Sequence, residues 1–402
     1  MDPIGQFGFT ARRQMLVFAL QTTKGFREVG PESGGCYNSV CMQRLSGRIG
    51  AQIVYNGSCV ADLIVSQPID FLTRNTIMMD KVTDWLLSGP PWIEYRTRVD
   101  LLDQLEDAPE VQRAREAMLA YPQITTLIEE LKEWPGPILK SHKSAAHLLH
   151  KLVFVAELGF RADDPGISNV IQRIQAHQSH EGPFQVLVNI SPKYGGTGKD
   201  QYVWMLCDAP LVLYALSKFG LSDTQPVRKA MEYLVGLVRE NGWPCAVAPE
   251  LGKFRGPGRK SDPCPYANLL MLKLLTQFSE YQSGRSLQVG VETLLSLWKQ
   301  RKERRPYLFA MGSGFEKLKA PMVWYDILHV SDVLTQITWA CDDGRLLEMI
   351  EIIQSKSDDE GRFTAESVWR DWKGWDFGQK REPSMWVTLI AYRILKRAGI
   401  SL

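Results

Sequence analysis

The fold is decided by the stretch Asn241-Gly-Trp-Pro-Cys-Ala-Val-Ala-Pro-Glu-Leu-Gly-Lys-Phe-Arg-Gly-Pro-Gly-Arg-Lys-Ser-Asp-Pro-Cys-Pro-Tyr-Ala-Asn-Leu-Leu-Met-Leu-Lys-Leu-Leu-Thr-Gln-Phe278. A tight Gly-Trp turn and a Gly/Pro-rich loop lead into a strongly apolar helix. Pro263 and Pro265 are tolerated only in a helix's first turn, where the backbone N–H has no partner in any case. The sequence therefore predicts a helix that begins near Asp262, is capped by Ser261 and continues to Phe278.

The same unit occurs four times along the chain. Each copy has a tight turn with glycine and an aromatic residue, an irregular loop, and a strongly apolar helix. The turns are Glu181-Gly-Pro-Phe184, Asn241-Gly-Trp243, Gly314-Phe315 and Glu360-Gly-Arg-Phe363, and the apolar helices are expected over 208–220, 266–278, 325–337 and 384–396, with a degenerate earlier copy over 145–159. Apolar helices that alternate with amphipathic ones suit an inner and an outer ring, because such pairs bury their faces only by stacking.

One of these turns, Gln178-Ser-His-Glu-Gly-Pro-Phe184, resembles the Q-x-x-x-G-x-(F/W) turn of the squalene cyclase and protein prenyltransferase superfamily. The turns at 241–243 and 360–363 are weaker copies. The resemblance extends over roughly residues 140 to 402. It implies an all-α fold, an (α/α) toroid or barrel of repeated helix pairs, whose inner helices begin around a central apolar cavity. One fold hosts many chemistries, so the resemblance alone leaves the reaction open.

The chain before the repeats falls into two parts. Residues 1–75 form a leader in which Asn56-Gly57, between two apolar runs, predicts a small hairpin. From Met79 onward the apolar spacing becomes helical, so residues 76–138 are predicted to be an N-terminal helical extension. Residues 139–402 would then form the toroid.

Composition excludes several classes of protein. A net charge of +2 gives no global field for nucleic acid or an anionic membrane, so no nucleic-acid partner is predicted. Seven cysteines without framework spacing favour a reducing compartment and a cytoplasmic location. No apolar run reaches membrane-spanning length, so no transmembrane segment is predicted.

The resemblance implies a zinc site. The β subunit of protein prenyltransferases holds Zn²⁺ with an Asp-x-Cys at an inner-helix start and a histidine one repeat later, and the matching positions here are Asp262, Cys264 and His329. Such a set leaves the fourth zinc position open and keeps an incoming thiol as thiolate. The positive end of the helix dipole is also expected to favour the ionised forms of Asp262 and Cys264.

The family also places an arginine and a lysine before this motif to hold a diphosphate. Arg259 and Lys260 stand nearby, although their spacing is narrower than the family's. Pro265 occupies the position of an aromatic residue in the family, and Tyr266 follows it. Other expected substrate-binding residues are aromatic: Trp243, Trp324 and Trp386. Aromatic faces stabilise a carbocation, but they equally pack large helical cores.

A second set of candidates carries acid–base chemistry. His147 and His150 share a helix face at the start of the degenerate copy, with His142 just before them, and Asp208 follows Cys207 at another inner-helix start. These groups are expected to act as acid and base in the cavity. The alternative is that the histidines are polar spots at a helix end.

Together these features predict an enzyme that acts on an apolar or isoprenoid-like small molecule in the central cavity, with zinc-assisted prenyl or alkyl transfer as one form of the chemistry. Neither Asp-x-Asp-Asp nor Asp-Asp-x-x-Asp occurs, which counts against a standard terpene cyclase. Two alternatives remain. One is a metal-free cyclase or lyase that uses histidine as acid and base, and the other is a non-catalytic toroid that binds a lipid or a partner.

Overall fold

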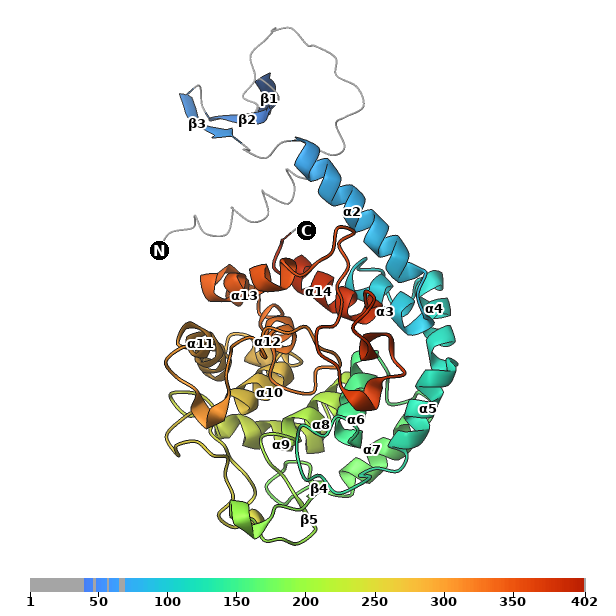
Figure 1. The fold of residues 1–402 in the computed structure, drawn as a ribbon, viewed down its shortest axis with the longest axis vertical. Helices are drawn as coiled ribbons and strands as arrows, with labels where there is room; N and C mark the ends of the chain where they lie inside the picture. Colours follow the sequence, from blue (N-terminus) through green and yellow to red (C-terminus); the bar gives the residue numbers. More distant parts are fainter. Residues whose placement is uncertain (1–39, 46–47, 56–57, 65–68, 401–402) are drawn as a thin grey trace. The chain divides into compact units, whose positions relative to one another are not determined.

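The computed structural model describes residues 40–45, 48–55, 58–64 and 69–400 (Figure 1). The chain divides into two compact units, Met1–Leu72 and Thr73–Leu402. The sequence places the end of the leader at residue 75, close to this division. The described residues are mostly helical, which confirms the all-α prediction at that level, although two small sheets are also present.

The first unit contains a three-stranded antiparallel sheet. Its strands are β1 (Val40–Leu45), β2 (Arg48–Tyr55) and β3 (Ser58–Ile64), and they follow one another in that order across the sheet. Tyr55 at the end of β2 pairs with Ser58 at the start of β3, on either side of the predicted hairpin turn. The turn residues between them, Asn56 and Gly57, lie outside the described residues.

The segment before the repeats is helical from Ile69 onward. Its helices are α2 (Ile69–Leu87), α3 (Pro91–Asp100), α4 (Pro109–Leu119) and α5 (Pro122–Leu131). The last three each begin at a proline, whose missing N–H is harmless in a first turn. The helix α5 buries Ile124, Leu127, Ile128 and Leu131, a spacing that forms one apolar stripe.

The repeats form helices of two kinds. The apolar helices are α6 (Leu148–Glu157), α8 (Ala209–Leu216), α10 (Pro265–Leu275), α12 (Ile327–Leu334) and α14 (Met385–Arg397). The amphipathic helices are α7 (Ile167–Gln175), α9 (Gln225–Gly236), α11 (Arg285–Lys299) and α13 (Gly344–Gln354). Every residue of α8, α10 and α12 is buried, whereas α7 buries a single stripe. The strands β4 (Val186–Val188) and β5 (Gln201–Val203) pair within one long loop.

The apolar helices pack against one another in chain order, α6 on α8, α8 on α10, α10 on α12 and α12 on α14. Figure 1 shows α6, α8, α10 and α12 towards the centre, with α7, α9, α11 and α13 outside them. The first and last of the series also meet, because the rings of Phe154 on α6 and Trp386 on α14 have centroids 5.4 Å apart. Trp92 of α3 contacts both rings.

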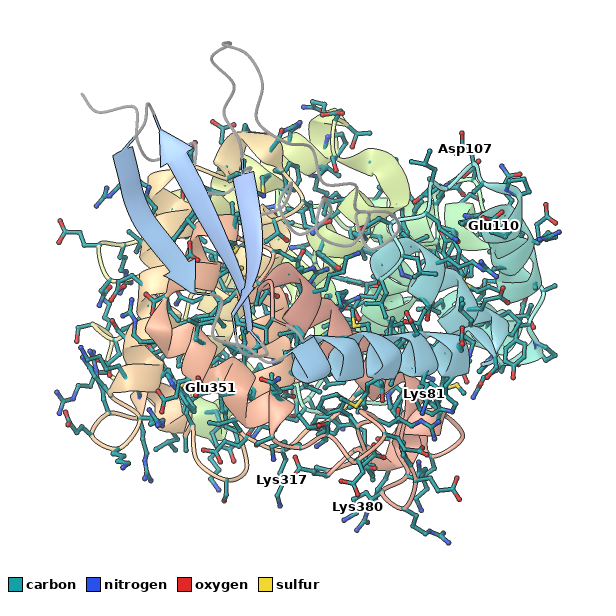
Figure 2. The ribbon with its side chains drawn as sticks, turned by 90° about the horizontal axis from the view of Figure 1, so that it is seen from above. Lys81, Asp107, Glu110, Lys317, Glu351 and Lys380 are labelled. Carbon is teal, nitrogen blue, oxygen red and sulfur yellow. The ribbon has the colours of Figure 1, made fainter. Side chains whose placement is uncertain are left out.

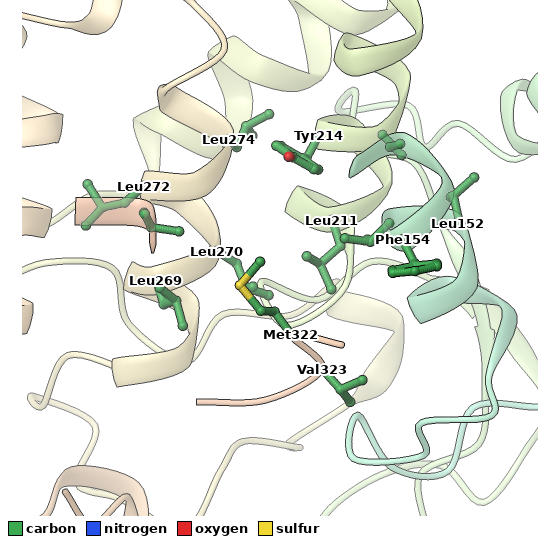
Figure 3. Packing of buried hydrophobic residues seen from close by; sticks show 14 of the residues in the cluster. Leu152, Phe154, Leu211, Tyr214, Leu269, Leu270, Leu272, Leu274, Met322 and Val323 are labelled. Atoms are coloured by element: carbon green, nitrogen blue, oxygen red, sulfur yellow. The ribbon is translucent and has the colours of Figure 1, made fainter. Parts of the chain in front are cut away.

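Side chains fill the space between these helices. In Figure 3, Phe154 of α6, Leu211 of α8 and Leu270 of α10 lie towards Met322 and Val323 from the loop before α12. All of these side chains are buried. The central cavity that the resemblance implies is therefore occupied by side chains in this region. A groove of about 460 Å³ lies instead against α11 and the loops before α10, lined in part by Asn241, Pro263 and Thr293.

The outer surface is charged, as the projecting Lys81, Asp107, Glu110 and Glu351 in Figure 2 illustrate. In the part of the chain that the structure describes, no helix is both long enough and apolar enough to cross a membrane.

Candidate functional site

The amino-terminal ends of the apolar helices meet at one end of the helix cluster. Their N-cap residues are His147, Asp208, Cys264, Asp326 and Ser384. Burial raises the pKa of Tyr266 in the first turn of α10, and the nearby Cys207, Asp208, Asp326 and Cys264 raise it further. Side chains at the starts of α8, α10 and α12 therefore lie close to Tyr266. The positive ends of several helix dipoles are gathered there.

The central polar contact at this end joins His142 to Asp208. Nε2 of His142 lies 3.2 Å from Oδ2 of Asp208, and Oδ1 of Asp208 accepts a hydrogen bond of 2.9 Å from the backbone N–H of Met205. Asp208 is completely buried, whereas the side chain of His142 keeps 13% of its surface exposed. No described hydrogen bond engages Nδ1 of His142. A buried carboxylate that orients a partly exposed imidazole is a suitable arrangement for acid–base chemistry.

His147 and His150 lie beside this pair but are held by other groups. His147 is the N-cap of α6, with Nδ1 accepting from the N–H of Leu149 at 3.1 Å and Nε2 donating to the carbonyl of Pro137 at 2.8 Å. Nε2 of His150 donates to the carbonyl of His142 at 2.9 Å. Burial lowers the pKa of both imidazoles, that of His150 to about 3. The predicted shared helix face is wrong, because His147 precedes the helix and caps it.

The predicted start of the apolar helix α10 is also wrong. The helix α10 begins at Pro265 with Cys264 as its N-cap, so Asp262 and Ser261 precede the helix and do not cap it. A residue before proline is disfavoured in the helical conformation, and Asp262 and Cys264 both stand before prolines. Oδ1 of Asp262 accepts a hydrogen bond of 3.0 Å from Arg304. Its carboxylate is thus engaged by a surface arginine rather than by the helix dipole.

The thiol of Cys264 is held in its neutral form. Burial raises its pKa to about 12, and the backbone N–H groups of Ala267 and Tyr266 lower it less. The expectation that the helix end favours the thiolate is therefore wrong for this residue. Loss of hydration opposes the charged form more strongly than one helix end supports it.

His329 in the first turn of α12 has one free ring nitrogen. Its Nδ1 donates to the carbonyl of Trp324 at 2.9 Å, and its Nε2 is buried and has no hydrogen-bond partner among the described residues. Burial lowers the pKa of His329 to about 3. A histidine with this second contact suits a metal ligand. However, among the described residues no group of three or more His, Cys, Asp and Glu side chains is arranged to hold a metal ion. Asp262, Cys264 and His329 thus do not form a fitted zinc set here, and zinc stays a prediction.

Two of the predicted substrate-binding residues form an aromatic wall at this end. The rings of Tyr266 and Trp324 have centroids 4.4 Å apart, and Phe309 stacks on Trp324 at 5.3 Å. The hydroxyl of Tyr266 donates to the carbonyl of Val323 at 2.8 Å, which fixes the ring. The ammonium of Lys143 lies 4.8 Å from the Trp324 ring centroid, so the wall already accommodates a cation.

The remaining predicted contacts lie elsewhere. Trp243 is fully buried, and its indole N–H donates to the carbonyl of Leu234 at 2.9 Å. Trp386 is buried against Trp92 and Phe154. Arg259 and Lys260 are exposed on the loop before α10. The two tryptophans are core residues, and the two basic residues belong to the surface.

One residue of this end was not singled out from the sequence. Asp326 caps α12 by accepting from the backbone N–H of His329 at 3.0 Å. Burial raises its pKa to about 7, against a smaller opposing effect of hydrogen bonding and of Lys319. An aspartate directly before an apolar helical run is a capping signal, and this signal in the sequence points to Asp326.

Comparison with known proteins adds little. No family model matches the chain, and no curated protein matches it. The crystal structure of a protein from Actinoplanes is similar over 81% of this chain and 99% of its own length, with 13% identity and a TM-score of 0.37. That likeness is too weak to carry an argument about the fold or the function.

Proposed function

We propose that this chain is an enzyme of the squalene cyclase and prenyltransferase type that acts on an apolar or isoprenoid-like small molecule without a metal. The reaction would take place at the amino-terminal ends of the apolar helices, with His142 as acid and base. The contact of His142 with the buried Asp208, at 3.2 Å, carries this proposal.

The proposal includes an (α/α) toroid. Three observations support it: the chain-order packing of α6, α8, α10, α12 and α14, the contact of Phe154 with Trp386 that joins the two ends of this series, and the amphipathic helices outside. The N-cap residues lie at one end of these helices. At the other end, buried ion pairs join residues near the carboxyl ends of the helices, such as Lys273 with Glu157 and Arg393 with Asp332. The apolar helices therefore run in the same direction, as the inner ring of a toroid requires.

The chemistry follows from the positions of the side chains. Nδ1 of His142 would accept a proton from the substrate or return one to it, while Asp208 holds the imidazole in place through Nε2. Tyr266 and Trp324 would bind the apolar part of the substrate and stabilise positive charge on it. An anionic group of the substrate would lie at the positive helix ends. Access requires loop movement, because side chains fill the central space in this structure.

Four cysteines of the helical part are free thiols: Cys207, Cys245, Cys264 and Cys341. This supports a reducing compartment, and we include a cytoplasmic location in the proposal.

The test uses a panel of isoprenoid hydrocarbons, alcohols and diphosphates. Binding is measured as a shift in thermal unfolding, and products are measured by mass spectrometry. The informative variant is His142→Gln, because the amide still donates to Asp208 but cannot take up a proton. We expect it to keep the shift and to lose product formation by at least about a hundredfold, the usual contribution of acid–base catalysis. His180→Gln, whose side chain is 84% exposed, is the matched control.

Each result has a defined meaning. A shift without any product in the wild type would favour the non-catalytic toroid that binds a lipid or a partner. Product formation that is equal in wild type and His142→Gln would reject the role of His142.

Zinc-assisted transfer at Asp262, Cys264 and His329 is a second candidate function. The observation that favours it is the buried Nε2 of His329, for which the described part of the chain offers no hydrogen-bond partner. Elemental analysis after dialysis tests it. About one zinc per chain, lost in Cys264→Ala, would support the zinc site, and a wild type without stoichiometric metal would reject it.

A further inference from the structure

Two loops at the surface combine into a basic patch. The first loop, residues 253–260, precedes α10, and the second, residues 301–305, follows α11. The basic patch is formed by Lys253, Arg255, Arg259, Lys260, Arg301, Lys302, Arg304 and Arg305. Glu303 is the sole acidic residue within these two ranges. The whole chain carries a net charge of only +2, so positive charge is concentrated here.

Tyr307 holds the two loops together. Its hydroxyl donates to the carbonyl of Arg259 at 3.1 Å, and its ring lies against Gly256 and Gly258. A Cβ on Gly258 would approach the ring of Tyr307 to 2.6 Å, so the close contact of the loops requires glycine there. Arg304 adds its ion pair with Asp262. The two loops of the basic patch are thus held together by direct contacts.

Most of its charges are not neutralised. Arg301 pairs with Glu348, and Arg304 pairs with Asp262. In the part of the chain that the structure describes, the other six basic side chains have no acidic partner. These are Lys253, Arg255, Arg259, Lys260, Lys302 and Arg305, and all six are exposed. Six unpaired, exposed cations on two joined loops are within the number that binds anionic lipid headgroups.

An apolar side chain projects beside these cations. Leu308 is 78% exposed, the largest exposure among the exposed large hydrophobic side chains of the described residues. Tyr307 and Leu308 have φ angles of 53° and 63°, in the left-handed region that residues with side chains rarely adopt. The buried Tyr307 therefore holds the backbone in a conformation that leaves Leu308 outside the core. Backbone strain of this kind persists only where the surrounding structure enforces it.

We propose that the basic patch, with Leu308 beside it, docks this protein on an anionic membrane surface. Unpaired lysines and arginines would bind the headgroups, and Leu308 would enter the acyl boundary. A nucleic acid fits less well, because a projecting aliphatic side chain offers no face on which bases stack.

Docking at this surface brings the lipid towards the candidate site. Gly256 within the first loop donates its backbone N–H to Sγ of Cys245 at 3.1 Å, and Cys245 lies close enough to Cys264 to contribute to raising its pKa. The patch therefore adjoins the N-cap of α10. The docking proposal stands on the charges and on Leu308, and it does not require the proposed enzyme activity.

The test is sedimentation of the full chain with vesicles of phosphatidylcholine, with and without 30 mol% (about a third) phosphatidylserine. We expect binding only to the anionic vesicles, weakening steeply between low and high salt. The double variant Arg259→Glu/Lys260→Glu should weaken binding by at least about twenty-five-fold, since each cation contributes about fivefold. Lys302→Glu/Arg305→Glu should act similarly from the second loop, and Leu308→Ser should reduce binding by a smaller factor.

The matched control is Lys380→Glu/Arg381→Glu, which makes the same charge change on the loop before α14, where Lys380 projects at the edge of the molecule (Figure 2). All of these side chains are exposed, and circular dichroism checks that the variants are folded. Three outcomes would overturn the proposal: equal binding to neutral vesicles or none to anionic ones, equal loss in the control and the patch variants, or tighter binding to single-stranded nucleic acid than to anionic vesicles.

Discussion

The two ends of the apolar helices have opposite electrostatic character. At the amino-terminal end, His142, Cys264 and Asp326 sit among helix caps, and burial shifts the pKa of Cys264 and Asp326 towards the neutral form. At the carboxyl-terminal end, buried ions are paired. Glu157 of α6 pairs with Lys273 of α10.

Further buried ion pairs lie at the carboxyl-terminal end of the helices. Arg393 of α14 donates to Asp332 of α12 at 2.9 Å and to Asp100 of α3 at 3.2 Å. Burial alone raises the pKa of Asp332, but Arg393, Arg397 and Lys273 together lower it to about 2. Paired charges thus join the helices at one end, whereas the other end keeps neutral groups and a partly exposed histidine.

The largest expected effect comes from breaking a buried pair at the carboxyl-terminal end. Lys273→Met leaves Glu157 buried without its partner and should lower the free energy of unfolding by about 3–5 kcal/mol. Denaturation with urea measures it. The double variant Glu157→Gln/Lys273→Met should recover most of the loss, since no uncompensated charge remains. If the double variant is no more stable than Lys273→Met, the pair is not the cause.

The second effect is the dependence of stability on pH. The folded pKa of His329 is lowered to about 3 by burial and by Lys273, with Asp332 opposing and His150 adding to this shift. The unfolded chain therefore binds the proton first as the pH falls below about 6.5, and this contribution to stability is lost between about pH 6.5 and 3. The slope should be about 1.4 kcal/mol per pH unit from this residue.

His329→Gln should reduce that slope by the same amount when urea unfolding is repeated from pH 7 to 4. The exposed His180→Gln should leave it unchanged. An identical slope in wild type and His329→Gln would mean that His329 is not the buried neutral histidine described here.

A smaller effect is expected at the N-cap of α12. Asp326→Ala removes the acceptor for the backbone N–H of His329 and should cost about 1 kcal/mol. Asp326→Asn keeps the cap. Because the folded pKa of Asp326 is raised to about 7, the wild type loses stability as the pH rises from about 4 to 7. Asp326→Asn should therefore gain relative stability over that range, and thermal unfolding at pH 5 and pH 8 would show whether it does.

The smallest effect on stability is expected at the candidate site itself. His142→Gln keeps a donor for Asp208 and should change the free energy of unfolding by less than about 0.5 kcal/mol. Urea unfolding of this variant beside wild type measures it. A loss as large as that of Lys273→Met would show that His142 fastens the fold, as the ion pairs do, and would remove the contrast between the two ends.

The sequence by itself determined the helices and their two kinds. Apolar residues fill every position of 209–216 and every position of 265–275 except Asn268 and Lys273, so these helices require burial on all sides. The stripe of α7 requires burial on one side, so inner and outer helices follow from hydrophobic periodicity. The turn glycines likewise mark the repeats. These signals are local, which is why the positions of the helices were predicted to within a few residues.

The tertiary structure alone decided which polar groups meet and in which protonation state. His142, His147 and His150 are near one another in sequence, yet the packing of α6 on α8 pairs only His142 with Asp208. The thiol of Cys264 was expected to be ionised from its place at a helix start, but burial raises its pKa to about 12. Spacing along the chain carries the periodicity of a helix, whereas desolvation and pairing depend on neighbours that only the folded chain supplies.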